Sequence, residues 1–512
     1  MRKFVFALAL TAFAATAFAA AQASQPKRPI TFKDMMAMKR LGSTAVSPDG
    51  KWLAYSVTTV NLEKNSKTTE LFLQPIAGGE PQKVAVAQPG DSGLQFAPDG
   101  HQILFLSARS GSQQIWLAAF DPATGAATDP TQLTHLSIAP DNALWAPDGK
   151  SIAFTAFVYP DCPAFTQADA SEGSAPDKCN AEKDAATAAS PVKAQIFTHL
   201  LFRHWDHWTG PKRSHLFLVA VQNPSPQTLP VRDLTPHQAN DVPPFSLEGG
   251  GCGCAFSPDS KQIAYTLKDV PVPAISTNAD IFTLDLDNPT AKAVKVSTSP
   301  GGDFSPAYSP DGKYLAWRSQ ARAGYESDKF RLVLYNREEK TIRDLLPNFD
   351  NWVDEFAWSP DSKQVYFVSG VKGGEPLFAT SLEGKMTLKN NDGEFSGLHP
   401  LPDGRSIVAS RMTVASPSEV VAVSDPVSGP APKNQFPIPG IQGTAQFGSM
   451  SVREIRQITS LNTALLYLQL DMPKMQPFWF TAKDGTKLQG FIVKPPNFNP
   501  AKKYPVKFLI HG

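Results

Sequence analysis

The sequence has almost no excess of charge of either sign, and it contains no long basic run. Its 48 lysine and arginine residues nearly balance 47 aspartate and glutamate residues, which leaves a formal net charge of +1 over 512 residues. Proteins that bind nucleic acids or anionic membranes through charge carry clustered lysine and arginine. We therefore expect neither of these two kinds of partner.

Cysteine is scarce, with Cys162, Cys179, Cys252 and Cys254 as its four residues. A small even number is compatible with disulfides in an oxidising compartment. We favour a bridge between Cys162 and Cys179, which would staple a loop. Cys252 and Cys254 are so close that a strained bridge and two free thiols both stay open. A zinc site is disfavoured because the pairs lack Cys-x-x-Cys spacing, and we expect no metal and no cofactor.

Long apolar runs are absent after the N-terminus. The chain starts with a basic stretch, residues 1–3, followed by an apolar run, residues 4–20, and a small-residue site at Ala21-Gln22-Ala23. This order is typical of a secretory signal peptide, so residues 1–23 are expected to be removed. The run is short for a membrane span, although an uncleaved anchor is the alternative. We expect an exported protein, periplasmic in a Gram-negative bacterium, with no membrane contact after cleavage.

Proline and glycine are abundant, with 46 and 34 residues, which is typical of many short strands joined by turns. A turn of the form Ser-Pro-Asp-Gly-Lys recurs seven times between short apolar segments, which predicts a repeated hairpin. Proline presets φ, aspartate can bond its own backbone, and glycine eases the exit into the next strand. The seven copies begin at Ser47, Ala97, Ala146, Ser257, Ser309, Ser359 and Leu401.

The spacing of these turns predicts a β-propeller over residues 31–470. The repeat prolines are 50, 49, 111, 52, 50 and 42 residues apart, and a period near 50 suits the four strands of a blade. The interval of 111 residues holds one candidate third strand, residues 215–221. We therefore place an insertion at about 161–210 in blade three and predict an all-β fold with seven blades, eight being the alternative. A short helix capped by Thr31 is expected before the first blade.

The chain changes character after about residue 476. A hairpin with an Asp484-Gly485 turn is followed by a continuous apolar run, residues 506–510. Such a run is typical of a buried strand in an α/β sheet, which needs neighbouring strands and covering helices. No sequence follows Gly512 to supply them. Residues 476–512 are therefore expected to start a second domain, in which the chain is truncated.

Two of these features resemble the prolyl oligopeptidase (S9) family of serine peptidases. One is the repeated turn, and the other is the segment from Asp484 to Gly512, which is similar to the first strands of the family's α/β-hydrolase domain. Residues 203–206 and 322–328 are most similar to the dipeptidyl-peptidase 5 and acylaminoacyl-peptidase branch. The resemblance covers residues 31–512 and implies a propeller followed by an α/β-hydrolase domain, here incomplete.

The resemblance also implies hydrolysis of peptides near their N-termini by a Ser-Asp-His triad. The sequence contains no Gly-x-Ser-x-Gly motif, and the family's three catalytic positions would lie beyond Gly512. We therefore name no catalytic residue and expect this chain to be inactive. His511 and Gly512 would begin the loop that helps to form the family's oxyanion hole.

One candidate for binding a peptide substrate follows the insertion of blade three. Arg203, His204, Trp205 and Asp206 combine charge with aromatic surface, and the alternative is ion pairing and packing within the blade. A metal site made with His207 is disfavoured, because positions 204 and 206 of a strand share a face that 207 does not.

A second candidate is the pair Glu326 and Asp328. An exopeptidase must recognise a free α-amino group, and carboxylates do so through charge-assisted hydrogen bonds. The alternative is a solvated loop, because Arg322, Lys329 and Arg331 lie close by in the sequence.

Two functions remain open from the sequence. The first is an exported serine exopeptidase of the dipeptidyl- or acylaminoacyl-peptidase type, and the second is a non-catalytic, TolB-like propeller that binds a protein partner. Residues 478–512 favour the first, because a binding propeller has no use for them.

Overall fold

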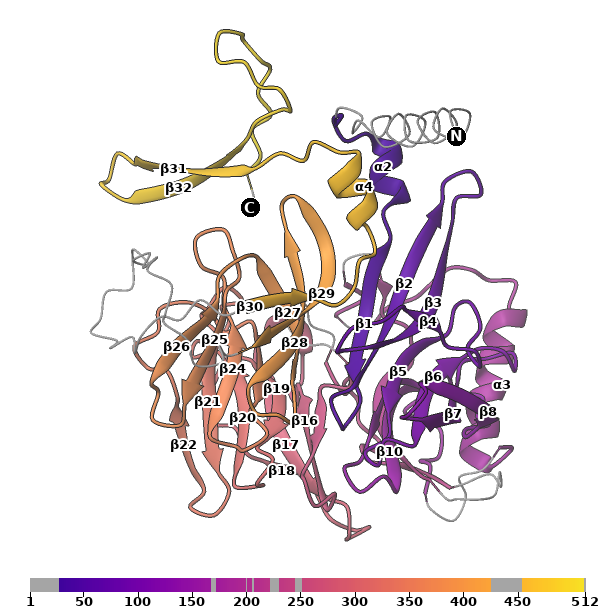
Figure 1. Cartoon of the computed structure of the whole chain (residues 1–512). Helices are drawn as coiled ribbons and strands as arrows, with labels where there is room; N and C mark the ends of the chain where they lie inside the picture. Colours follow the sequence, from indigo (N-terminus) through magenta and orange to yellow (C-terminus); the bar gives the residue numbers. More distant parts are fainter. Residues whose placement is uncertain are drawn as a thin grey trace, which may run out of the picture.

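The computed structural model describes residues 27–166, 172–198, 200–204, 207–221, 230–244, 251–424 and 454–510. These residues form seven four-stranded antiparallel sheets, the blades of a β-propeller (Figure 1). The predicted all-β fold with seven blades is confirmed, and the described residues contain no eighth four-stranded sheet.

The blades follow one another along the chain, and each is hydrogen-bonded in sequence order. Blades one to four consist of β1 (Arg40–Val46), β2 (Trp52–Asn61), β3 (Ser66–Pro75) and β4 (Gln82–Lys83); β5 (Ser92–Phe96), β6 (Gln102–Ser107), β7 (Gln114–Asp121) and β8 (Ala126–Gln132); β9 (Asp141–Trp145), β10 (Ser151–Val158), β13 (Arg213–Ala220) and β14 (Val231–Asp233); and β15 (Cys254–Phe256), β16 (Gln262–Leu267), β17 (Asp280–Asp285) and β18 (Val294–Lys295).

Blades five to seven have the same order, without any exchange of strands between the first and last blades. They consist of β19 (Asp303–Tyr308), β20 (Tyr314–Ser319), β21 (Arg331–Asn336) and β22 (Thr341–Asp344); β23 (Glu355–Trp358), β24 (Gln364–Val368), β25 (Leu377–Ser381) and β26 (Met386–Asn390); and β27 (Glu394–Pro400), β28 (Ser406–Thr413), β29 (Ser416–Ser424) and β30 (Glu454–Gln457). A 3₁₀ turn, η1 (Pro273–Ile275), lies in blade four.

The repeated turn joins the first and second strands of a blade, as the sequence indicates. In blade one the Ser47 hydroxyl donates to the Asp49 carboxylate at 2.6 Å and accepts from the Trp52 backbone N–H at 2.9 Å. Gly50 has a φ of +71°, a conformation that glycine adopts without steric cost. Local chemistry within six residues therefore fixes the turn.

Two copies of the turn carry serine in place of this glycine, and both serines connect neighbouring blades. Ser260 and Ser362 have φ values of +59° and +61°, which are unusual for a residue with a side chain. Their hydroxyls accept hydrogen bonds at 3.0 Å from the backbone N–H groups of Asp148 and Asp311, in the turns of the preceding blades. A contact between blades thus offsets the backbone cost.

A second repeated contact explains the Leu-Thr sequence that ends several blades. The Thr134 hydroxyl accepts from the backbone N–H of Ile115 at 2.9 Å and donates to the side chain of Gln114 at 2.8 Å. Ser297 makes the same pair of bonds with Ile281 and Asp280 in blade four. Each hydroxyl therefore ties the end of the fourth strand to the start of the third.

The ring closes through side chains that join blade one to blade seven. Leu53 and Tyr55 of β2 pack in one buried cluster with Val408 and Val420 of blade seven. The Gln74 side chain donates to the carbonyl oxygen of Ile458 at 2.9 Å. Apolar packing and hydrogen bonds thus replace a shared strand.

Two short helices reinforce this closure, and Figure 1 shows them side by side. They are α2 (Phe32–Ala37), with the predicted Thr31 cap, and α4 (Thr463–Leu468). Met38 packs in a buried cluster with Leu466 and Leu470. The ends of the propeller are therefore held together outside the sheets as well.

A buried histidine at the closure predicts sensitivity to acid. The Thr44 hydroxyl lies 2.9 Å from His399 Nε2, and burial lowers the pKa of His399 to about 4. The unfolded chain binds a proton at about pH 6.5, so stability should fall as the pH drops from about 6.5 to about 4. Compared with His399→Gln, the wild type should lose up to about 3 kcal/mol more over this interval in urea unfolding series. Parallel pH profiles of the two proteins would contradict this assignment.

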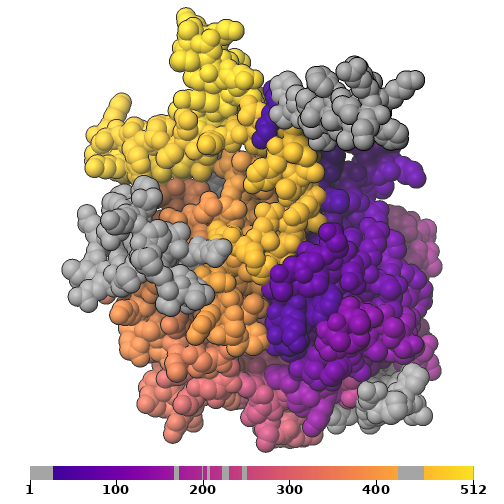
Figure 2. Space-filling model, in the orientation of Figure 1, coloured from indigo at the N-terminus to yellow at the C-terminus, as the bar shows by residue number. Residues whose placement is uncertain are grey.

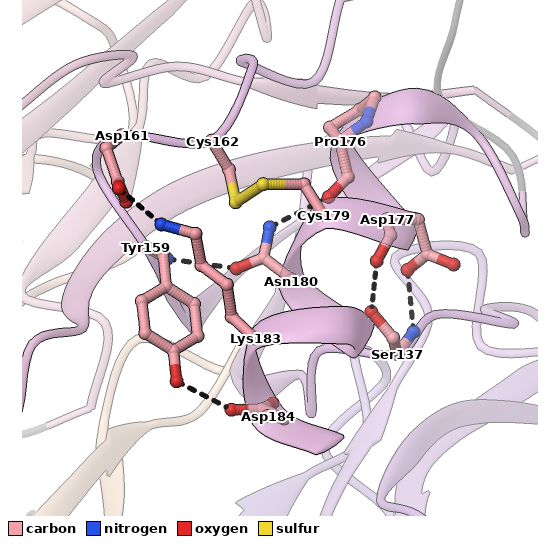
Figure 3. The surroundings of a disulfide bond; sticks show 10 residues. All are labelled: Ser137, Tyr159, Asp161, Cys162, Pro176, Asp177, Cys179, Asn180, Lys183 and Asp184. Atoms are coloured by element: carbon pink, nitrogen blue, oxygen red, sulfur yellow. Dashed lines mark hydrogen bonds and ion pairs between the residues drawn. A yellow bond between two sulfur atoms is a disulfide. The ribbon is translucent and has the colours of Figure 1, made fainter. Parts of the chain in front are cut away.

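The insertion of blade three lies between β10 and β13, which are paired over their whole length. It contains α3 (Ala175–Ala189), and a disulfide joins Cys162 to Cys179 on this helix (Figure 3). The Asn180 side chain accepts from the Tyr159 backbone N–H at 2.9 Å. The helix is thus held at the end of β10, and its presence was not expected from the sequence.

After the seventh blade, β31 (Met475–Thr481) and β32 (Lys487–Val493) form the expected hairpin, and the segment projects from the propeller (Figure 2). The predicted buried strand at residues 506–510 is wrong for this structure. These residues form no strand, and the side chain of Phe508 is 81% exposed. In the described part of the chain no strand pairs with them, so nothing excludes water from their apolar surface. No helix among the described residues is long and apolar enough to cross a membrane.

Candidate functional site

The C-terminal hairpin, β31–β32, contacts one end of the propeller. Phe491 lies so close to Gly373 that a Cβ atom there would be 2.3 Å from the phenyl ring. Lys372 Nζ lies 5.7 Å from the centroid of the Trp479 ring. Both contacts are with the connection between the second and third strands of blade six. In an antiparallel blade this connection is at the opposite end from the repeated turns, so the hairpin faces the end where the blade-three insertion also emerges.

A cavity of about 620 Å³ occupies the central channel of the ring. Most of its wall comes from the first strands of six blades, including Ser43, Gln95, Asn142, Pro306 and Phe356, and the second strands add Leu106 and Arg318. In these six blades the first strand therefore lies next to the central channel. The size is within the range of about 300–1,000 Å³ that small-molecule sites occupy.

Charged groups of both signs line the channel. Arg318 donates from Nε to the carbonyl oxygen of Val353 at 2.9 Å, and its guanidinium lies 4.4 Å from the centroid of the Phe330 ring. The Glu355 carboxylate accepts from two backbone N–H groups of blade seven at 2.8 and 2.7 Å. Both charged groups are thus held by the fold and form part of the wall of the cavity.

The pKa of Glu375, on the blade-six connection, is affected by Glu355 and by two other nearby carboxylates. Burial, followed by the charges of Asp354, Glu394 and Glu355, raises the pKa of Glu375 to about 7. This side of the propeller therefore carries a carboxyl group that exchanges its proton near neutral pH. Such a group can donate or accept a hydrogen bond, or accept one from an ammonium group once it is ionised.

The predicted cluster at residues 203–206 is described only in part. Arg203 lies on β11 (Arg203–His204), which pairs with β12 (His207–Trp208), and its guanidinium is 5.9 Å from the centroid of the Trp208 ring. Trp208 also stacks on Phe197 at 5.7 Å. Trp205 and Asp206 lie outside the described residues. The side chain of Arg203 therefore contacts Trp208 on the paired strand β12.

The second predicted pair lies between β20 and β21. The Asp328 carboxylate accepts from the backbone N–H groups of Ala321 and Arg322 at 2.7 and 2.9 Å, and it pairs with the Arg322 guanidinium at 3.1 Å. These partners hold the pKa of Asp328 below its usual range against the opposing effect of burial. Asp328 thus closes its own loop, and Glu326 remains exposed beside it.

The structure does not gather the predicted residues into one site. Among the described residues, neither Arg203 nor Glu326 lines the central cavity. His511 and Gly512 lie outside the described residues. In the described ranges no group of three or more His, Cys, Asp or Glu side chains is arranged to hold a metal ion.

The channel residues escaped sequence analysis for a simple reason. Asp141 lies on the first strand of blade three and Arg318 on the second strand of blade five, and only the ring brings them to one cavity. A usable signal exists, because the first strand of a blade precedes each repeated turn. Polar residues in that strand are candidates for the channel wall.

The curated relatives that this chain resembles in sequence are named as peptidases. The chain is 27% identical over 485 residues to dipeptidyl-peptidase 5 of Porphyromonas endodontalis and 26% identical over 483 residues to that of Porphyromonas gingivalis. Each match covers 93% of this chain and 62% of the relative. The names of these relatives support the resemblance to the prolyl oligopeptidase (S9) family. No profile of a protein family matches the chain.

Solved structures show the same fold. An acylaminoacyl peptidase in complex with Z-Gly-Gly-Phe-chloromethyl ketone matches with a TM-score of 0.62 at 15% identity, over 92% of this chain and 60% of that one. An acylaminoacyl peptidase of Pyrococcus horikoshii matches with a TM-score of 0.61 at 13% identity, over 92% and 60%. The chain thus spans about three fifths of the length of the S9-type proteins that it resembles.

Proposed function

We propose that this chain is the propeller portion of an exported serine exopeptidase that removes short units from the N-termini of peptides. The observation that carries the proposal is the match to dipeptidyl-peptidase 5, which covers 93% of the chain. The acylaminoacyl-peptidase type of cleavage is the related choice, since those structures share the fold.

The role of this portion follows from the channel and the end that faces the hairpin. Peptides carry an ammonium group at one end and a carboxylate at the other. Asp141, Glu355 and Arg318 all line the cavity, so its wall carries charges of both signs that can attract the two kinds of terminus. We propose that the propeller admits and orients short peptides in this way, without taking part in the bond-breaking step.

Export is part of the same proposal. Residues 1–23 have the order of a signal peptide, with Ser24 as the expected first residue of the mature protein. Expression with the native N-terminus in a Gram-negative host, followed by N-terminal sequencing of the periplasmic fraction, tests it. Retention of Met1 on a cytoplasmic product would contradict export.

The 512-residue chain itself should not hydrolyse peptides. It contains no Gly-x-Ser-x-Gly, and loss of a catalytic triad lowers kcat by about 10⁶-fold in a serine peptidase. We expect no turnover of fluorogenic dipeptidyl or acylaminoacyl substrates and no labelling by a fluorophosphonate probe. Turnover that such a serine reagent abolishes would contradict this expectation.

The alternative is a TolB-like propeller that binds a protein partner, and the gene distinguishes the two. Under the exopeptidase proposal, the reading frame continues past the codon for Gly512 and encodes a Gly-x-Ser-x-Gly motif. A stop codon at that point would favour the binding propeller. The exposed apolar residues of β31 and β32, such as Trp479 at 53%, favour the exopeptidase, because a second domain can cover them.

A further inference from the structure

The two disulfides of this protein occupy very different surroundings. The bridge between Cys162 and Cys179 spans 17 positions and joins the loop after β10 to helix α3. The bridge between Cys252 and Cys254 spans two positions, so of the two alternatives that the sequence left open the structure has the bridge and not two free thiols. Only the second pair lines the central cavity, together with Gly251 and Gly253.

The Cys162–Cys179 bridge has a clear structural role (Figure 3). Figure 3 shows it beside the Asn180 contact and the ion pair of Lys183 with Asp161, which tie the same helix to the same loop. Cys162 is 5% exposed. A bridge across a loop of this length also restricts the unfolded chain substantially.

The Cys252–Cys254 bridge lacks such a role. The entropy that a disulfide removes from the unfolded chain rises with loop length, so a three-residue ring contributes least. The backbone here is also held without it. Cys254 begins β15 and pairs with Tyr265, and the Gly253 carbonyl oxygen accepts from the Thr266 backbone N–H at 3.0 Å.

The glycine between the two cysteines is required by the fold. Gly253 has a φ of +54°, and a Cβ atom there would lie 2.6 Å from the Cβ of Pro243. The chain can therefore bring Cys252 beside Cys254 only with glycine as the spacer. The fold thus favours this bridge, although the bridge contributes little to stability. This combination points to a reaction of the sulfur atoms as its role.

We propose that Cys252 and Cys254 form a redox-active disulfide that exchanges with low-molecular-weight thiols entering the central channel. The cavity of about 620 Å³ is large enough for a thiol of tripeptide size, and Cys252 and Cys254 lie in its wall. Arg318, in the same wall, can attract the carboxylates that such a thiol carries. The inference is independent of the proposed peptidase activity.

Reduction of the bridge consumes two small thiols. The thiolate of the first attacks one cysteine sulfur, a mixed disulfide forms, and the bond between Cys252 and Cys254 breaks with its electron pair on the leaving sulfur, which takes a proton. The second thiolate attacks the sulfur of the small molecule, which releases the other cysteine. Two thiols become one small disulfide, and the protein gains two thiols. Cys252 Sγ lies 3.4 Å from the Cys254 carbonyl oxygen, to which the reduced thiol can donate a hydrogen bond.

The test equilibrates the full chain in graded mixtures of reduced and oxidised glutathione. Free thiols are trapped with acid and alkylation, and each cysteine pair is then quantified by peptide mass spectrometry. We expect the channel pair to be half-reduced at a value of [GSH]²/[GSSG] at least 100-fold lower than the insertion pair requires, a difference of about 59 mV. Near-ultraviolet circular dichroism should stay unchanged while the channel pair is reduced.

Matched variants separate the two bridges. The double variant C162S/C179S keeps only the channel pair and should reproduce its midpoint, while C252S/C254S should keep the midpoint of the insertion pair. In Cys252→Ser, Cys254 should form a mixed disulfide with oxidised glutathione. Equal midpoints for the two bridges, reduction of the channel pair only on unfolding, or no adduct on Cys254 would each overturn the proposal.

Discussion

Replacing Asp91 with alanine should destabilise the protein by about 3–5 kcal/mol, because it leaves a buried cation without its partner. Asp91 accepts from the Arg109 guanidinium at 2.6 Å, and the two side chains are only 4% and 12% exposed. Arg109 lies over the rings of Phe105 and Trp116, so it cannot move into water without losing these contacts. The measurement is the free energy of unfolding from urea titration.

A matched control uses an exposed ion pair. Glu70 and Lys83 are 2.6 Å apart, but their side chains are 31% and 64% exposed. Glu70→Ala should therefore cost no more than about 1 kcal/mol. If Asp91→Ala costs as little as this control, the buried pair does not have the role that its geometry indicates.

Truncation of Phe217 should have a similarly large effect, a loss of about 3–5 kcal/mol. Its side chain is fully buried in β13 and stacks on Phe154 at 5.3 Å. Phe165, which follows β10 in the blade-three insertion, meets the same ring edge-on at 5.6 Å. Phe217→Ala thus leaves a cavity where the sheet and the insertion meet, so both should lose stability together.

The control for this variant is Phe157 on the neighbouring strand β10. Its side chain is 58% exposed, so Phe157→Ala should change stability by no more than about 0.5 kcal/mol. Limited proteolysis adds an independent readout, because Phe217→Ala should expose the insertion to cleavage at a lower urea concentration than the wild type. Equal costs for the two variants would contradict the assignment of the core.

Much of the fold could be predicted because the contacts that fix its turns and caps join residues close together in the sequence. The repeated turn is built from a hydroxyl, a carboxylate and a glycine within six residues, as at Ser47 to Trp52. A repeat of about 50 residues then specifies how many blades follow. The Thr31 cap of α2 is local in the same sense, since it depends on Asp34 three positions later.

The sites were less accessible to sequence analysis. Asp328 is a plausible ligand for an ammonium group by residue type, but its carboxylate is used by Ala321 and Arg322 in its own loop. Helix α3 was not expected, because its alanine-rich sequence lies in a segment read as irregular. Its docking depends on Asp177, which accepts from the backbone N–H of Ser137, a residue 40 positions away.

By itself, the sequence determined the blade-building turn, the seven-fold repetition, the insertion in blade three and the hairpin that follows the propeller. Only the tertiary structure decided how the ring closes and what lines its channel. The bond between Thr44 and His399 joins residues 355 positions apart, and Arg318 and Cys254 line the same cavity only because the ring brings their blades together. Turns obey short-range stereochemistry, whereas the channel arises from the curvature of seven packed sheets, which no single segment encodes.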